Sequence, residues 1–198
     1  YLHDTMYVVG HFHLTMAASS YLASFAAIYF WFPKMFGKEM NATLGKIHFW
    51  GSVIFITLSF SGQFVAGFSG QHRRLFIPYE YEYLKELLQL NRLTSFSAFI
   101  LGIFQIPFII NFFQSVLAGK KAEQNPWEVT TLEWTHASSP PVHHNYDEIP
   151  TVVRGPHEYA NPEVKKKLGR DYLDQVEPFD MKEEAGAPAA EAAASAAE

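Results

Sequence analysis

The chain has 198 residues, a formal net charge of −5 and no cysteine. The lack of cysteine excludes disulfide frameworks and thiolate metal sites, so any metal must be held by histidine, carboxylate or partner chains. Apolar residues are concentrated in the first 119 positions, whereas the remaining positions are polar and contain most of the prolines.

Three stretches of the apolar part contain no Asp, Glu, Lys or Arg, namely residues 5–33, 47–72 and 93–119. Each is longer than the ~20 residues with which a helix crosses the ~30 Å hydrocarbon core of a membrane. We therefore predict an all-α integral membrane bundle with three transmembrane helices. The alternative is a protein in water with three helices buried in its core.

Capping residues and proline indicate where these helices begin and end. The first helix is predicted to span Thr5–Phe32. The second should have Asn41 as its N-cap and run to about Phe68, and the third should end near Gly119. We expect the first helix to stop at Pro33, because proline disrupts a helix interior. The Tyr- and Glu-rich segment 79–91, before the third helix, is suited to the membrane surface.

The second predicted region, residues 122–198, is a polar tail that follows the three-helix region 1–121. Its first part has few apolar residues and many prolines, so we expect an extended tail along the surface of its complex. Residues 185–198 are mostly alanine, and we expect disorder there.

The orientation in the membrane can be predicted from basic residues. The first residue is Tyr1, and no basic segment or cleavage site precedes the first apolar stretch. We therefore expect no signal peptide and a sequence that starts inside a longer protein. Basic residues are slightly more numerous on the side of loop 34–46 and the tail, which predicts a cytoplasmic tail.

Two histidines, His11 and His13, lie inside the first apolar stretch and are separated by Phe12. Because each residue of a helix turns by ~100°, the two imidazoles should point ~200° apart and cannot chelate one metal. If both are ligands, they serve two centres, and imidazole is an axial ligand of haem iron. The alternative is that each histidine is hydrogen-bonded to a neighbouring helix.

Charged residues are expected at the start of the first helix and after the second. His3 and Asp4 suit a hard cation with further ligands from another chain, although Asp4 also suits a helix cap. Arg73 and Arg74 should emerge on the same membrane face. Paired arginines bind carboxylates such as haem propionates, and lipid headgroups are the alternative partner.

The sequence HDTMYVVGHFH, residues 3–13, resembles the HDTxYVVxHFH signature of subunit I of haem–copper terminal oxidases, in the branch of cytochrome c and quinol oxidases. NATLGKIHF is similar to the start of that subunit's eleventh helix, and FSGQHRR to its loop with an arginine pair. NPWEVTTLEW and SSPPVHHNYDEIP resemble the C-terminal segment of bacterial oxidases. The resemblance extends to about residue 160 and implies helices ten to twelve of twelve. Met6, Phe64 and His72 stand where many members have Tyr, His and Pro.

The resemblance implies a role for the residues of the first helix. His11 matches the axial ligand of the high-spin haem a3 at the oxygen-reducing site. His13 matches an axial ligand of the low-spin haem a, and Phe12 lies between the two haems. His11 and Phe12 would then be the catalytic residues of this chain.

The resemblance also implies roles for the charged residues. His3 and Asp4 match ligands of a magnesium or manganese ion that is shared with subunit II. Arg73 and Arg74 match the pair that binds the haem propionates.

By the same implication, the complete enzyme is a proton-translocating cytochrome c oxidase of the respiratory chain, an oxidoreductase of aerobic respiration in the bacterial inner membrane. It would take electrons from cytochrome c and reduce oxygen to water. The ligands of CuB would lie in helices one to nine of subunit I, outside this chain, so the chain alone would not be catalytic. Subunit II with CuA, subunit III and membrane lipid are the other expected partners, and no nucleic acid partner is expected.

Three other interpretations remain open. A quinol oxidase or nitric oxide reductase would also place two histidines in this way. A membrane assembly subunit without haem would use the histidines for structure alone. A diheme cytochrome would need two more histidines on a facing helix, and His48 is the only further histidine near a span.

Overall fold

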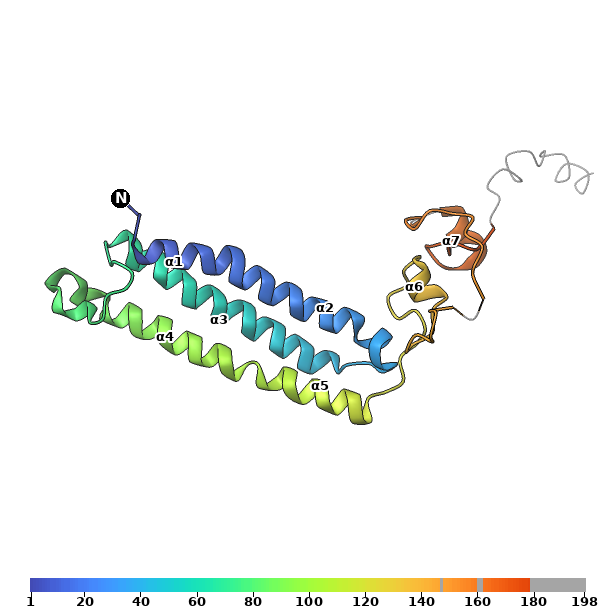
Figure 1. Ribbon diagram of the computed structural model, residues 1–198, viewed down its shortest axis with the longest axis horizontal. Coiled ribbons are helices and arrows are strands. Elements are labelled where there is room, and N and C mark those ends of the chain that lie inside the picture. Colours follow the sequence, from blue (N-terminus) through green and yellow to red (C-terminus); the bar gives the residue numbers. More distant parts are fainter. Residues whose placement is uncertain (147, 160–161, 179–198) are drawn as a thin grey trace, which may run out of the picture. The chain divides into compact units, whose positions relative to one another are not determined.

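The computed structural model describes residues 1–146, 148–159 and 162–178, in which the regular elements are helices and the only bridges are isolated ones. The predicted all-α fold is therefore confirmed. Three helical rods are long and apolar enough to cross a membrane: Met6–Phe36, Ala42–Phe68 and Glu82–Ala118. Figure 1 shows them side by side, with Ala42–Phe68 between the other two.

The first span consists of α1 (Met6–Phe12), a π-helical segment (His13–Ala18) and α2 (Ser19–Phe36). We did not predict the π-helical segment, which widens the helix directly after His13. Two side-chain hydroxyls form hydrogen bonds with backbone carbonyls in and next to this segment. Thr15 donates to the His11 carbonyl at 3.0 Å, and Ser19 donates to the Thr15 carbonyl at 2.5 Å. Such segments are frequent at functional sites.

The expectation that the first helix stops at Pro33 is wrong, because α2 continues to Phe36. A proline removes one backbone hydrogen bond, and here it does so in the last turn, where few bonds depend on it. The helix ends instead at Gly37, whose φ of 64° is left-handed and whose amide donates to the Pro33 carbonyl at 2.8 Å. Glycine adopts this conformation without steric cost.

The second span, α3 (Ala42–Phe68), has Asn41 as its N-cap, as predicted. The Asn41 side chain accepts hydrogen bonds from the first-turn amides of Thr43 and Leu44. Near its other end α3 crosses α1 so closely that a Cβ atom on Gly67 would lie 2.1 Å from the Tyr7 nitrogen. Only glycine permits this approach.

A 3₁₀ turn, Pro78–Glu80, precedes the third span. The span begins with the 3₁₀ helix Glu82–Leu87 and continues as α4 (Leu88–Ile103) and α5 (Ile106–Ala118). Its predicted end near Gly119 is confirmed. The break at Phe104 and Gln105 was not predicted, and Pro107 explains it, because proline has no amide to continue the helix. The Gln105 side chain donates to the Leu101 carbonyl at 2.8 Å and so satisfies a group beside the break.

The loop between α2 and α3 is held against the end of α5. Asn111 is fully buried, accepts a hydrogen bond from the Asn41 amide at 2.8 Å and donates to the Asn41 carbonyl at 3.0 Å. The Lys38 ammonium donates to the Val116 carbonyl at 2.6 Å. These contacts join the three spans at the end of the bundle farthest from Tyr1 (Figure 1).

The residues from 123 onward that the structure describes form a second compact unit, which we describe by itself. Besides the extended segments expected of a tail, it contains two short helices, α6 (Leu132–Thr135) and α7 (Pro162–Leu168). Trp134, Val164 and Leu173 are almost completely buried and form a small apolar core. These apolar residues are far apart in the sequence, which explains why their packing was not predicted. The predicted disorder at 185–198 lies outside the described residues.

Candidate functional site

The start of α1 and the loop after α3 meet at one end of the bundle. The Met6 amide donates to the Gln71 carbonyl at 2.9 Å, and the Arg73 amide donates to the Asp4 carbonyl at 3.0 Å. Between these bonds Thr5 forms an antiparallel bridge with His72. The structure thus brings the predicted His3–Asp4 pair and the predicted arginine pair to the same end of the spans.

Asp4 is a partner of Arg73 and not the cap of α1, because the N-cap is Thr5. The Arg73 Nε donates to the Asp4 carboxylate at 2.5 Å. This hydrogen bond, with the charges of Arg73, Arg74 and His3, holds the pKa of the Asp4 carboxyl below its ordinary value. Asp4 is therefore ionised at neutral pH and can act as a metal ligand.

Asp4 and the residue after Arg73 have left-handed backbone conformations: φ is 62° at Asp4 and 69° at Arg74. Aspartate tolerates this region, whereas for arginine it is uncommon. Such conformations cost about 1–3 kcal/mol each and are typical of functional sites, where surrounding contacts hold them. The two main-chain hydrogen bonds beside Asp4 and Arg73 provide such contacts.

A metal at His3 and Asp4 would need ligands from elsewhere. The described part of the chain contains no group of three or more His, Cys, Asp or Glu side chains that could hold a metal ion. His3 is exposed and Asp4 is partly exposed, so both are accessible to another chain. Two ligands from one chain are compatible with a cation at a subunit interface.

One ring nitrogen of His13 is hydrogen-bonded to its own helix, and the ring packs against two phenylalanines. Its Nδ1 lies 2.8 Å from the Val9 carbonyl oxygen, so Nδ1 carries the proton and donates. Its ring stacks on Phe60 of α3 at 4.9 Å between centroids and lies 4.4 Å from the Phe12 ring. In this tautomer of the neutral ring Nε2 is the nitrogen that can bind a metal, an arrangement that metal-ligating histidines commonly have.

His11 differs from His13 in its surroundings. Its side chain is exposed, and it makes no hydrogen bond or ring contact with any other described residue. Phe12 beside it is 39% exposed. Among the described residues the His13 ring stacks on Phe60 of α3, whereas His11 has no ring contact of this kind. That the two rings face different sides of α1 stays a prediction. An apolar group on each side of the helix would fit these residues.

Sequence reasoning missed a polar cluster that joins all three spans around His48, which is 2% exposed. The His48 Nε2 lies 2.9 Å from the Gln105 Oε1, and its Nδ1 lies 3.2 Å from the Tyr29 hydroxyl. The Tyr21 hydroxyl donates to the same Gln105 oxygen at 2.5 Å and lies 3.2 Å from the Ser52 hydroxyl. Polar residues inside the three charge-free stretches were the available signal.

Comparison with known proteins gives consistent matches over most of the chain. The sequence model of the family described as "Cytochrome C and Quinol oxidase polypeptide I" matches residues 1–100. The chain is 40% identical over 160 residues, 81% of its length, to "Cytochrome c oxidase subunit 1" of Synechocystis sp.. It is 36% identical over 175 residues, 88% of its length, to the protein of the same name from Thermostichus vulcanus.

A third relative, "Alternative cytochrome c oxidase subunit 1" of Bradyrhizobium diazoefficiens, is 34% identical over 89% of this chain. These matches cover 28%, 31% and 30% of the three relatives, in the order given. The chain therefore spans less than a third of the length of these relatives.

Proposed function

Because the chain belongs to the family of cytochrome c and quinol oxidase polypeptide I, we propose that it forms the C-terminal part of the catalytic subunit I of a proton-translocating cytochrome c oxidase. The missing part, helices one to nine, would come from the remainder of that subunit. The observation that carries the proposal is the pair His11 and His13, on one membrane-spanning helix and in two different environments.

In this proposal His13 holds the low-spin haem a and His11 holds the high-spin haem a3. The Val9 carbonyl fixes the tautomer of His13, and the stacked Phe60 ring fixes the plane of its imidazole. Phe12 lies between the two ligands on the same helix. When bound, the haems together with CuB supply the electron transfer that reduces oxygen to water.

The charged end of the bundle would hold the polar edges of these groups. Only one of the five N–H donors of the Arg73 guanidinium is engaged in the bond to Asp4, so its two Nη groups retain donors for a propionate. Arg74, held beside it, offers a second guanidinium. The ionised Asp4 and His3 would bind magnesium or manganese, with the remaining ligands from subunit II.

The proposal includes the orientation and the partners of the complex. The tail would face the cytoplasm of a bacterial cell, and subunits II and III and cytochrome c would complete the electron-transfer complex. A quinol oxidase is the second candidate, because the description of the matching family includes quinol oxidases. The described residues do not distinguish one haem type from another by its side groups, so the haem type must be measured.

The test is an absorption spectrum of the reduced complex, purified through this chain, with and without carbon monoxide. We expect two haems, of which one binds carbon monoxide, because His11 and His13 serve different irons. Bands of a-type haem would support cytochrome c oxidase, whereas b- or o-type bands would support the quinol oxidase. A complex without haem would overturn the proposal and favour a purely structural role for both histidines.

A further inference from the structure

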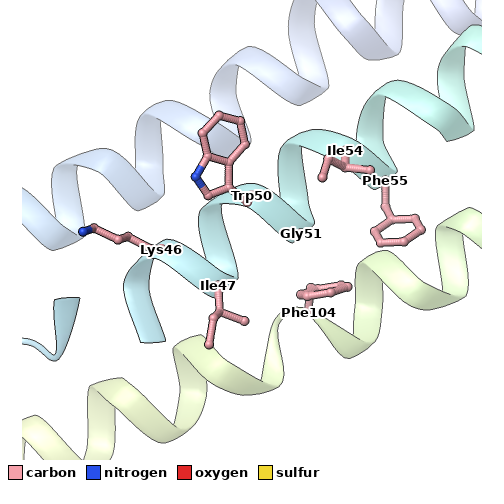
Figure 2. A pocket seen from close by; sticks show the side chains of 7 residues that line it. All are labelled: Lys46, Ile47, Trp50, Gly51, Ile54, Phe55 and Phe104. Atoms are coloured by element: carbon pink, nitrogen blue, oxygen red, sulfur yellow. The ribbon is translucent and has the colours of Figure 1, made fainter. Parts of the chain in front are cut away.

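A groove lies on the exposed side of α3, at the break between α4 and α5. Figure 2 shows its floor, where the Phe104 ring lies against Gly51, between Ile47 and Phe55. The volume is about 340 Å³, and Lys46, Trp50 and Ile54 complete the lining. All of these side chains are apolar except Lys46, which lies at one end of the groove.

The sequence explains why the groove is there. Pro107 interrupts the third span, and the interruption directs Phe104 toward α3. A Cβ atom on Gly51 would lie 2.0 Å from the Phe104 ring, so the ring rests on the bare backbone of α3. Phe55 stacks on the same ring at 5.4 Å between centroids. The groove therefore has a rigid floor made of two helices.

The lining of the groove is apolar throughout, and the Lys46 ammonium extends beyond one end of it (Figure 2), so that charge and apolar surface follow one another as in a lipid molecule. Lys46 is four residues after the start of α3, about 6 Å along its axis, so its flexible chain can bring the ammonium to the headgroup level. Trp50 is 60% exposed and lies one turn farther along α3, and tryptophan is a residue type that is enriched at membrane interfaces. Ile54 lies about 12 Å beyond Lys46 along the helix, where only hydrocarbon is present.

Lys46 has a positive charge without a counter-ion in this chain. It is exposed and makes no ion pair with any residue that the structure describes. At the same end of the bundle, Lys38 is engaged by the carbonyls of α5 and Lys120 faces Glu39 at 3.8 Å. Lys46 is thus a cation left for an anionic partner directly above an apolar groove.

From this complementarity of charge and shape, we infer that the groove binds one anionic phospholipid. An acyl chain lies along Ile47, Gly51 and Phe104, and the phosphate pairs with Lys46. The inference requires that the three spans lie in a membrane, and it does not depend on the proposed haem ligands.

The test uses the complex purified through this chain and returned to lipid bilayers of nanodiscs. The probes are phosphatidylglycerol and phosphatidylcholine with the same photoactivatable acyl chain, and mass spectrometry counts adducts on the α3 peptide. We expect phosphatidylglycerol to label the wild-type groove several times more than phosphatidylcholine. Lys46→Gln should reduce phosphatidylglycerol labelling about fivefold, the usual contribution of one basic residue near a membrane surface. Lys121→Gln, an exposed lysine at the same end, is the matched control and should change little.

A second pair of variants tests the groove itself. Ile54→Trp fills the groove and should abolish labelling by both lipids, whereas Leu58→Trp, one turn farther along α3, should leave it unchanged. Equal labelling of Lys46→Gln and wild type, or adducts on another protein chain in place of α3, would overturn the inference. The labelling does not depend on haem, so a colourless complex with a labelled groove would refute only the proposed function.

Discussion

Two regions of the bundle contain histidines, and the surroundings of these histidines differ. In the cluster at His48 both ring nitrogens lie within hydrogen-bonding distance of side chains of other spans, Gln105 and Tyr29. In the region of His11 and His13, one nitrogen of His13 is bonded to its own helix and the other is free, and His11 makes no side-chain contact of this kind with a described residue. A histidine with both ring nitrogens bonded inside the chain joins helices, whereas a histidine with a free nitrogen can bind a further group, which is the role that we propose for His13.

The largest effect should come from removing the histidines themselves. His13→Leu should remove the low-spin haem, and His11→Leu should remove the haem that binds carbon monoxide. Turnover should fall at least about a hundredfold in each variant, because loss of even an outer-shell partner of a metal ligand costs ~10–100-fold. Reduced spectra with and without carbon monoxide, together with oxygen consumption, measure both.

His48→Leu is the matched control for this comparison. It removes a buried histidine of the same bundle, and both haem spectra should persist, although the complex should unfold at a lower temperature. If His48→Leu removed one haem as selectively as His13→Leu, the distinction between the two regions would be wrong.

The second effect concerns the close crossing that positions the His11–His13 segment against α3. Gly67→Ala places a methyl group 2.1 Å from the Tyr7 nitrogen, so α1 must move away. Overpacking of this kind costs about 1–3 kcal/mol. We expect a lower midpoint of thermal unfolding in detergent and broadened haem bands.

Gly102→Ala is the control, and its expected effect on stability has the opposite sign. Apart from its chain neighbours and the backbone of its own helix, no atom of a described residue lies within 4 Å of the position that a Cβ atom on Gly102, in α4, would take. Replacing an unstrained helical glycine by alanine usually stabilises by about 0.4–1 kcal/mol. If Gly67→Ala and Gly102→Ala lowered the unfolding midpoint equally, the crossing at Gly67 would not be a close contact in the complex.

The third effect tests the polar cluster. Gln105→Leu should leave the Tyr21 hydroxyl and the His48 Nε2 without their common acceptor, at a cost of about 1–3 kcal/mol. The exposed Gln114 of the same span is the control, and Gln114→Leu should change the unfolding midpoint little. The haem spectra of Gln105→Leu should equal those of wild type. Loss of a haem in this variant would show that the cluster supports the haem region.

The three spans and the cap at Asn41 were predictable because they depend on local properties, namely charge-free length and capping chemistry. The π-helical segment after His13 and the continuation of α2 past Pro33 were not, because competing backbone hydrogen bonds of similar strength decide them. The break at Gln105 had a sequence signal in Pro107, but its consequence depends on the neighbouring spans.

The candidate site was predictable only in part. The spacing of His11 and His13 and the resemblance to the family named the residues, since helical geometry separates neighbours at i and i+2. The pairing of Asp4 with Arg73 was not predicted, because it joins residues far apart in the chain through a strained loop. The role of His48 depended on Tyr29 and Gln105, which approach it only in the folded bundle.

The smallest effect is expected at the end of the bundle that contains neither histidine region. The Lys38 ammonium donates to the carbonyls of Val116 and Leu117 in the last turn of α5. A cation there interacts favourably with the helix dipole, typically by ~0.3–1 kcal/mol. Lys38→Met should therefore lower the unfolding midpoint slightly and leave turnover and both haem spectra unchanged.

Lys121→Met is its control, because Lys121 is an exposed lysine at the same end. The comparison predicts an order of stability, with Gln105→Leu below Lys38→Met and Lys38→Met below Lys121→Met. If Lys38→Met were as damaging as Gln105→Leu, the loop between α2 and α3 would hold the spans together as strongly as the buried cluster. The cohesion of the bundle would then depend on its end rather than on the polar contacts around His48.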